Sequence, residues 1–163
     1  MHMARSTRTK RIKDLPRIGI DIDGVMIDHV DAILKKTREM GYSFKPEQTP
    51  GEILIKLVKP VHYERLQRYI YGRKTLTSPP VEGALQSFRK LLKHFDVYII
   101  SRRKTDLFPR LWFYMNLPEF SQRKILFVKH DAEKAIIARK LGISFFIDDR
   151  QSVLKALEDV EHR

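Results

Sequence analysis

The sequence contains no cysteine and no apolar run that approaches the roughly 18–20 residues needed to cross a bilayer. The lack of cysteine excludes disulfide bonds and thiolate metal sites, and it leaves the redox compartment open. The N-terminus also lacks the apolar segment of a signal peptide, so we expect a cytoplasmic protein. The histidines are scattered along the chain, and no zinc site is expected from their spacing.

The sequence has fewer acidic than basic residues. It contains 20 aspartates and glutamates and 32 lysines and arginines, which gives a formal net charge of +12. Part of this excess lies at the start of the chain, where we expect residues 1–16 to form a basic tail. A basic surface favours phosphate-bearing ligands and polyanions, but a solvated tail explains the charge without a nucleic-acid partner. The 163 residues, of which 42% are hydrophobic, suffice for one folded domain with an inserted subdomain.

Apolar runs and amphipathic helical patterns follow one another along the chain. The runs predict buried strands, and their spacing predicts right-handed crossovers in a parallel α/β sheet. We expect strands at 17–23, 96–101, 125–129 and 144–148. We expect helices at 28–40, 51–58, 60–71, 81–94, 106–116, 132–141 and 152–160.

Side chains with oxygen atoms follow three of these apolar runs. Asp21 and Asp23 leave the first run and meet a glycine that allows a sharp turn. Ser101 ends the second run, and the acidic pair Asp148-Asp149 follows the last. Because ligands of parallel α/β sheets bind outside the carboxyl ends of the strands, we expect these residues to gather at one edge of the sheet.

Each of these features also has an ordinary explanation when it is taken alone. An Asp-x-Asp pair is common in turns, Asp148 and Asp149 can cap the last helix, and Ser101 can be a loop hydroxyl. Their order along the chain and their shared place at strand ends favour one common site. Two acidic strand ends of this kind are suited to hold Mg²⁺ and to present a carboxylate nucleophile.

The order Asp-x-Asp-Gly-Val, a serine after an apolar strand, a lysine and then Asp-Asp resembles the haloacid dehalogenase (HAD) superfamily of phosphohydrolases. The resemblance spans residues 17 to 150. It implies a three-layer Rossmann-like (HAD-like) α/β core of residues 17–29 and 79–163, with a small helical cap inserted at 30–78. The short cap and the ending Ile147-Asp148-Asp149-Arg150 are most similar to the 5'(3')-deoxyribonucleotidase group.

The resemblance implies that Asp21 attacks phosphorus as an ionised carboxylate and forms an aspartyl-phosphate. Asp23 would protonate the leaving alkoxide and then take a proton from the attacking water. Mg²⁺ takes about six oxygen ligands, and Asp21, Asp148 and the backbone carbonyl of Asp23 would supply some of them. Asp149 would hold these ligands in place rather than bind the ion itself.

Phosphate oxygens need hydrogen-bond donors and a cation that offsets their charge. We expect Ser101 and Arg102 to bind the phosphate. Two lysines compete for the role of the cation. Lys134 lies in the first turn of the helix expected at 132–141 and matches the spacing of the family's lysine before Asp148, whereas Lys129 ends the preceding strand. Lys134 is preferred, and Lys129 stays open as the alternative.

Together these residues predict a Mg²⁺-dependent phosphomonoesterase for a small phosphorylated substrate, with a nucleoside monophosphate preferred. A sugar phosphate or a nucleic-acid terminal phosphate is the alternative within the same chemistry. A signalling receiver domain uses similar residues, but it carries its phosphorylated aspartate in mid-chain, where this chain has Ser101. A non-catalytic nucleic-acid-binding domain is supported by the basic tail alone.

Overall fold

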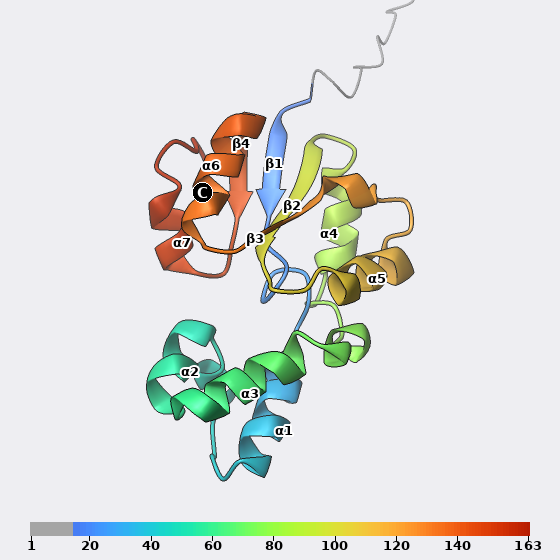
Figure 1. Cartoon of the computed structure of the whole chain (residues 1–163). Helices are drawn as coiled ribbons and strands as arrows, with labels where there is room; N and C mark the ends of the chain where they lie inside the picture. Colours follow the sequence, from blue (N-terminus) through green and yellow to red (C-terminus); the bar gives the residue numbers. More distant parts are fainter. Residues whose placement is uncertain (1–14) are drawn as a thin grey trace, which may run out of the picture.

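A four-stranded parallel sheet lies at the centre of the computed structural model, which describes residues 15–163 (Figure 1). The strands lie in the order β3-β2-β1-β4, and each pairs in parallel with its neighbours. The α/β class with a Rossmann-like parallel sheet, predicted from the sequence, is therefore confirmed. The strands are β1 (Arg17–Ile20), β2 (Asp96–Arg102), β3 (Ile125–Val128) and β4 (Ile143–Ile147).

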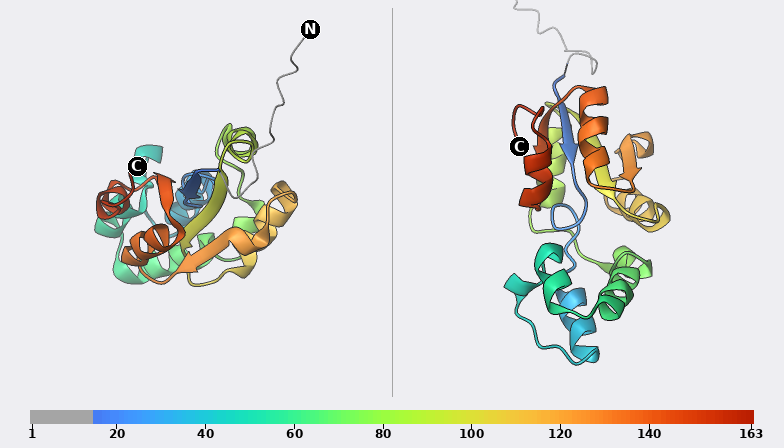
Figure 2. Two further views of the ribbon diagram at one scale, coloured as in Figure 1. Left: turned by 90° about the horizontal axis from the view of Figure 1, so that it is seen from above. Right: turned by 60° about the vertical axis from the view of Figure 1, so that its left-hand side comes forward.

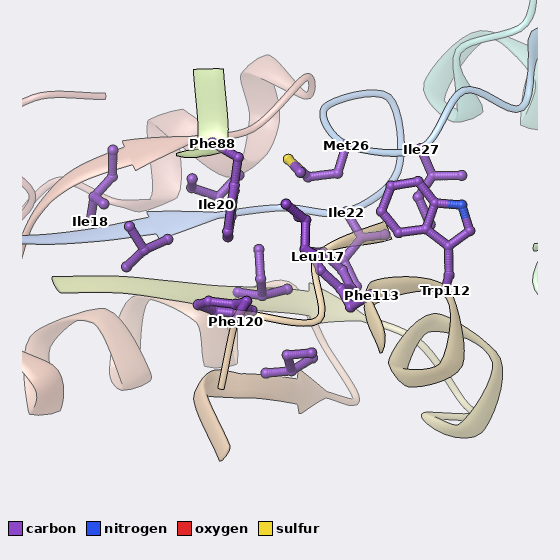
Figure 3. Close-up of a cluster of buried hydrophobic side chains, with 13 residues drawn as sticks. Ile18, Ile20, Ile22, Met26, Ile27, Phe88, Trp112, Phe113, Leu117 and Phe120 are labelled. Atoms are coloured by element: carbon purple, nitrogen blue, oxygen red, sulfur yellow. The ribbon is translucent and has the colours of Figure 1, made fainter. Parts of the chain in front are cut away.

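Helices cover both faces of the sheet and complete three layers (Figure 2). Two helices pack over each face, because an apolar stripe at helical spacing must be buried. The larger hydrophobic cluster joins aromatic rings to the isoleucines of β1, as Figure 3 shows for Phe88, Phe113 and Ile20. The helices are α4 (Ala84–Leu91) and α5 (Leu107–Asn116) on one face, and α6 (Ala132–Leu141) and α7 (Gln151–Ala156) on the other.

A second group of helices lies beyond the carboxyl ends of the strands (Figure 1). These helices bury a hydrophobic cluster of their own, separate from the two clusters beside the sheet. The group occupies the stretch where the sequence predicts a cap at 30–78, and we refer to it as the cap. Its elements are α1 (Val30–Glu39), η2 (Pro46–Gln48), α2 (Gly51–Leu57), α3 (Pro60–Ile70) and η3 (Arg73–Thr77).

Most of the expected helices and strands are present, with bounds that differ by up to three residues. The helix predicted at 81–94 begins at Ala84 and ends at Leu91. It begins late because the N–H group of Val81 donates to the carbonyl of Met26 (3.0 Å), so this backbone is bonded to the loop after β1. Within residues 15–163 no helix is long and apolar enough to cross a membrane. Nearly all of the basic tail predicted at 1–16 lies outside the described residues.

The helix predicted at 152–160 is wrong beyond Ala156, where α7 ends. The chain then turns back along the open edge of β4. The N–H group of Phe146 donates to the carbonyl of His162 (2.8 Å), and the N–H group of His162 donates to the carbonyl of Ser144 (3.0 Å). This pairing satisfies backbone groups that an uncovered edge strand would leave free, which continuing the helix would not do.

The close packing of β1 against β4 predicts a large effect of one added methyl group. A Cβ atom at Gly19 would lie 2.6 Å from two ring atoms of Phe146. We expect Gly19→Ala to lower the free energy of unfolding by about 1–3 kcal/mol, as measured by urea denaturation, because the ring must leave its preferred position.

Trimming the ring should relieve the same clash. In the double variant Gly19→Ala/Phe146→Leu, we expect a loss of stability at least about 0.5 kcal/mol smaller than the sum of the two single losses. Strictly additive losses would contradict the contact.

Candidate active site

The loop that follows β1 places the first acidic pair. The N–H group of Asp21 still pairs with the carbonyl of Ile147 on β4 (2.9 Å), and the chain then turns back on itself, with the N–H group of Met26 bonded to the carbonyl of Ile22 (2.8 Å). Gly24 sits in this turn at a φ of 78°, a left-handed conformation that favours glycine. A Cβ atom there would also collide with the carboxylate of Asp149. Glycine at this position is therefore required by the backbone and by the acidic pair from the other end of the chain.

Three carboxylates from the two ends of the chain meet at the carboxyl ends of β1 and β4. Asp21, Asp148 and Asp149 each offer an oxygen atom, and these atoms all lie within 4.8 Å of one another. Lys134, from the first turn of α6, is fully buried beside them. Its ammonium donates to Asp148 Oδ2 (2.6 Å) and forms an ion pair with Asp21 Oδ1 (3.0 Å). The topology therefore brings together three of the four acidic residues that the sequence placed at the strand ends, namely Asp21, Asp148 and Asp149.

Two buried oxygen atoms at this site have no hydrogen-bond partner among the described residues. They are Asp21 Oδ1, whose contact with Lys134 lacks hydrogen-bond geometry, and Ser101 Oγ. A buried polar atom without a partner costs free energy, so both atoms are suited to an external ligand. A cluster of three carboxylates fits Mg²⁺, which prefers oxygen ligands, and the hydroxyl of Ser101 fits an anion that the ion brings with it.

The charges in the cluster shift two carboxyl pKa values upward. Burial raises the pKa of Asp21, and the carboxylates of Asp148 and Asp23 raise it further, while Lys134 opposes them. Burial and the charges of Asp21 and Asp148 raise the pKa of Asp149 to about 6. In both cases burial raises the pKa most, and an excess of negative charge from neighbouring carboxylates adds to it. A bound cation at this point would remove that excess.

The two lysines left open by the sequence lie in different surroundings. Lys134 is buried between two carboxylates, whereas the side chain of Lys129 is exposed and no salt bridge of the described residues includes it. Arg102 is exposed as well, and its guanidinium lies 3.1 Å from Asp131. Arg102 borders the same cavity as the carboxylates, so it remains within the site without contacting the acidic cluster.

Asp23 lies apart from the acidic cluster, and its carboxylate is held by residues that the sequence did not single out. Arg103 donates to both of its oxygen atoms, one of them at 3.0 Å, and His29 Nε2 lies 2.9 Å from Asp23 Oδ1. Although burial opposes ionisation, Arg103 and His29 hold the pKa of Asp23 well below its usual range. Any bond from Asp23 to a metal in the cluster would therefore come from its backbone carbonyl.

The strand pattern contains a signal that separates Arg103 from Arg102. Side chains two residues apart in a strand point to the same face, and neighbours point to opposite faces. Ser101 and Arg103 are buried, and Arg102 between them is exposed. Alternation from Ser101 would therefore have indicated Arg103 as the arginine that points into the site.

A cavity of about 530 Å³ joins this site to the cap. Its floor is formed by Asp21, Asp23 and Ser101 at the strand ends. Its far side is formed by cap residues, most of them apolar, including Ile33, Leu54, Leu66, Ile70 and Tyr63. The acidic residues and a mostly apolar surface of the cap therefore line the same cavity.

Residues 15–161 match the family described as 5' nucleotidase, deoxy (pyrimidine), cytosolic type C protein (NT5C). The chain belongs to this family. Because the match covers the sheet, the cap and every residue of the candidate site, the HAD resemblance drawn from the sequence is confirmed. This member of the nucleotidase family is a HAD-type phosphatase. No similar sequence was found among the curated proteins.

Solved structures resemble this nucleotidase-family chain in fold. A HAD-superfamily hydrolase of subfamily IA, variant 1, from Geobacter sulfurreducens has a TM-score of 0.56 at 17% identity, with 90% of this chain and 83% of that chain covered. A hydrolase from Streptococcus pneumoniae TIGR4 has a TM-score of 0.57 at 13% identity, with 91% and 90% covered. A haloacid dehalogenase-like family hydrolase from Xanthomonas campestris has a TM-score of 0.51 at 14% identity, with 87% and 78% covered. At these identities the likeness establishes the HAD-like fold alone.

The acidic cluster predicts a stabilising effect of Mg²⁺ that can be measured without substrate. An ion that binds only the folded state at roughly 100 times its dissociation constant stabilises by about 2.7 kcal/mol, which raises Tm by about 5–10 °C for a chain of this size. We expect this rise for the wild type in MgCl₂ and its loss in EDTA, measured by differential scanning fluorimetry.

Variants of the acidic cluster should distinguish residues that bind Mg²⁺ directly from residues that only orient those ligands. Asp148→Asn should abolish the Mg²⁺-dependent rise in Tm, and Asp31→Asn, at an exposed carboxylate of α1, should leave it unchanged. Asp149→Asn should reduce it less than Asp148→Asn if Asp149 only orients the ligands. A wild-type protein whose Tm does not respond to Mg²⁺ would contradict the site.

Proposed function

We propose that the protein is a Mg²⁺-dependent phosphomonoester hydrolase that acts through an aspartyl-phosphate on a nucleoside monophosphate. One observation carries the proposal. The buried carboxylate of Asp21 has an oxygen atom without a hydrogen-bond partner among residues 15–163, and it belongs to an acidic cluster that lines a cavity next to the cap. An ionised, poorly solvated carboxylate of this kind is suited to attack phosphorus without a base to activate it.

The proposed reaction has two steps in which atoms and protons balance. A carboxylate oxygen of Asp21 attacks phosphorus, the bond to the alcohol oxygen breaks, and that oxygen takes a proton from Asp23. Asp23 must first lose its contact with Arg103 or His29 and become protonated, because these contacts favour its ionised form. Water then attacks the phosphorus of the aspartyl-phosphate, Asp23 takes a proton from it, and the bond to Asp21 breaks to release inorganic phosphate. Mg²⁺, held by Asp21, Asp148 and the carbonyl of Asp23, would offset the negative charge that the two anions bring together.

The phosphoryl group needs further partners at the same place. Ser101 Oγ is buried beside the cavity and has no hydrogen-bond partner in the described part of the chain, so it is available to donate to a phosphate oxygen. Lys134 supplies the positive charge that lets two carboxylates stay close together, and its ammonium is suited to face the transferring group. Arg102 at the rim of the cavity remains a candidate for a more distant phosphate oxygen.

The lining of the cap favours a nucleoside over a sugar phosphate. Ile33, Leu54, Leu66 and Ile70 are at most 7% exposed, and each borders the cavity. A sugar would bring hydroxyl groups against these apolar side chains and leave them without partners. A nucleobase instead presents a flat ring that packs against apolar and aromatic groups such as Tyr63. The cap helices that border the cavity also disfavour a polynucleotide end, because a polymer needs an open path past them. A cytoplasmic location stays a prediction from the sequence.

A substrate screen tests the proposed reaction. We expect the wild type with Mg²⁺ to release inorganic phosphate from nucleoside monophosphates faster than from sugar phosphates or 5'-phosphorylated oligonucleotides. Asp21→Asn should lower kcat by at least roughly 10³-fold because the nucleophile is lost. Asp31→Asn should retain wild-type turnover. Sugar phosphates as the best substrates would contradict the substrate class, and an active Asp21→Asn variant would contradict the mechanism.

The two lysines give a second test of the same site. We expect Lys134→Ala to lower kcat/KM by roughly 10²-fold or more, because the buried cation beside the phosphoryl group is lost. Lys129→Ala should change kcat/KM by less than about twofold, as is usual for an exposed charge away from the reacting atoms. The greater loss in Lys129→Ala would show that the cation has been assigned to the wrong residue.

A further inference from the structure

The guanidinium of Arg103 is buried and contacts several side chains outside the acidic cluster. Its side chain has no exposed surface. It donates to both carboxylate oxygens of Asp23 and, from Nη1, to the hydroxyl of Thr75 (3.0 Å). It also lies over the ring of Tyr71, at 4.9 Å from the ring centroid. A residue held on three sides in this way has a single orientation, and so does the carboxylate that it binds.

The partners of Arg103 and Asp23 come from both connections between the core and the cap. His29 directly precedes α1, on the first connection, and its other ring nitrogen lies 3.1 Å from Ser78 Oγ on the second. Tyr71 ends α3, and Thr75 lies in η3, which leads back to the core. The carboxylate of Asp23 is therefore bonded, directly or through one residue, to the segments that would have to move if the cap moved.

We propose that Arg103 is a positioning residue that sets the direction of the Asp23 carboxylate and couples it, through Thr75 and Tyr71, to the position of the cap. The inference rests on the proposed function, in which Asp23 transfers the proton to the leaving oxygen. In the arrangement of this structure both oxygen atoms of Asp23 are bound by Arg103 and His29, and these contacts favour the ionised carboxylate. One of them must be released toward the substrate before the proton can pass.

The shape of the guanidinium explains why arginine is needed. Its planar fork binds both oxygens of a carboxylate and keeps a further N–H group for a third partner. In Arg103 that third partner is Thr75, whose own hydroxyl donates to the carbonyl of Ile70 at the end of α3. A displacement of η3 would therefore move the guanidinium of Arg103, which is the group that binds the carboxylate of Asp23. A lysine at this position would keep the charge and lose the fork.

A purely structural role for Arg103 would predict an equal loss of activity with every substrate. A positioning role predicts a loss that depends on the leaving group. An alkoxide needs a proton to depart, whereas p-nitrophenolate leaves as a stable anion and hardly needs one. The ratio of kcat/KM between the two kinds of substrate therefore reports the action of Asp23 alone.

The test compares the best nucleoside monophosphate of the screen with p-nitrophenyl phosphate. We expect Arg103→Lys to lower kcat/KM roughly 10²-fold for the nucleotide, the usual size of a general-acid contribution, and less than about threefold for p-nitrophenyl phosphate. Thr75→Val, which keeps the shape and removes the hydroxyl, should show the same contrast. Thr75→Ser, which retains the hydroxyl, should behave as the wild type.

A measurement without substrate separates this role from the metal site. Arg103 makes no hydrogen bond or ion pair with Asp21, Asp148 or Asp149. The rise in Tm with Mg²⁺ should therefore stay within about 1 °C of the wild-type rise in Arg103→Lys and in Thr75→Val, because neither variant removes a ligand of the ion.

Equal losses with both substrates, or none with either, would overturn the inference. If Arg103→Lys does not fold, Thr75→Val decides the question by the same contrast. A different result would contradict the proposed function itself, namely a wild-type protein that releases phosphate from neither substrate in the presence of Mg²⁺.

Discussion

A buried lysine between two carboxylates is the interaction on which the rest of the site depends. Removing an ammonium group from water costs several kcal/mol unless it is paired, and Lys134 is paired on both sides by Asp21 and Asp148. Those carboxylates follow β1 and β4, which are neighbours in the sheet. The order of the strands is therefore a precondition for the charge arrangement. Asp149 adds a further negative charge nearby, so the three carboxylates together carry more negative charge than Lys134 offsets, which favours binding of a divalent cation.

The cap and the core are linked by polar contacts as well as by chain connections. Glu52 on α2 and Ser152 on α7 are hydrogen bonded across the cavity, and both line it. At the opposite side, Arg103 and His29 bind Asp23 and the two connections. The cap thus contacts the core at two places, and Glu52, Ser152, Asp23 and His29 all line the same cavity.

The strands and their acidic ends could be predicted, because buried parallel strands leave continuous apolar runs and ligands gather at one end of them. The pairing of Arg103 with Asp23 could not be predicted, because strand alternation from Ser101 indicates which arginine points into the site but not which carboxylate it binds. The end of α7 was missed for a related reason. Leu157 and Val160 are both buried, and their spacing fits a helix as well as the turn that carries them back to β4.

The chain has one tryptophan, and its place gives the protein a built-in optical probe. Trp112 is buried in α5, and its indole N–H group donates to the carbonyl of Ser78 (3.0 Å) on the second connection to the cap. The emission of an indole depends on the polarity around it and on that hydrogen bond. Tryptophan fluorescence therefore reports on the second connection between the cap and the core, so a ligand that moved the cap would change the signal without any label.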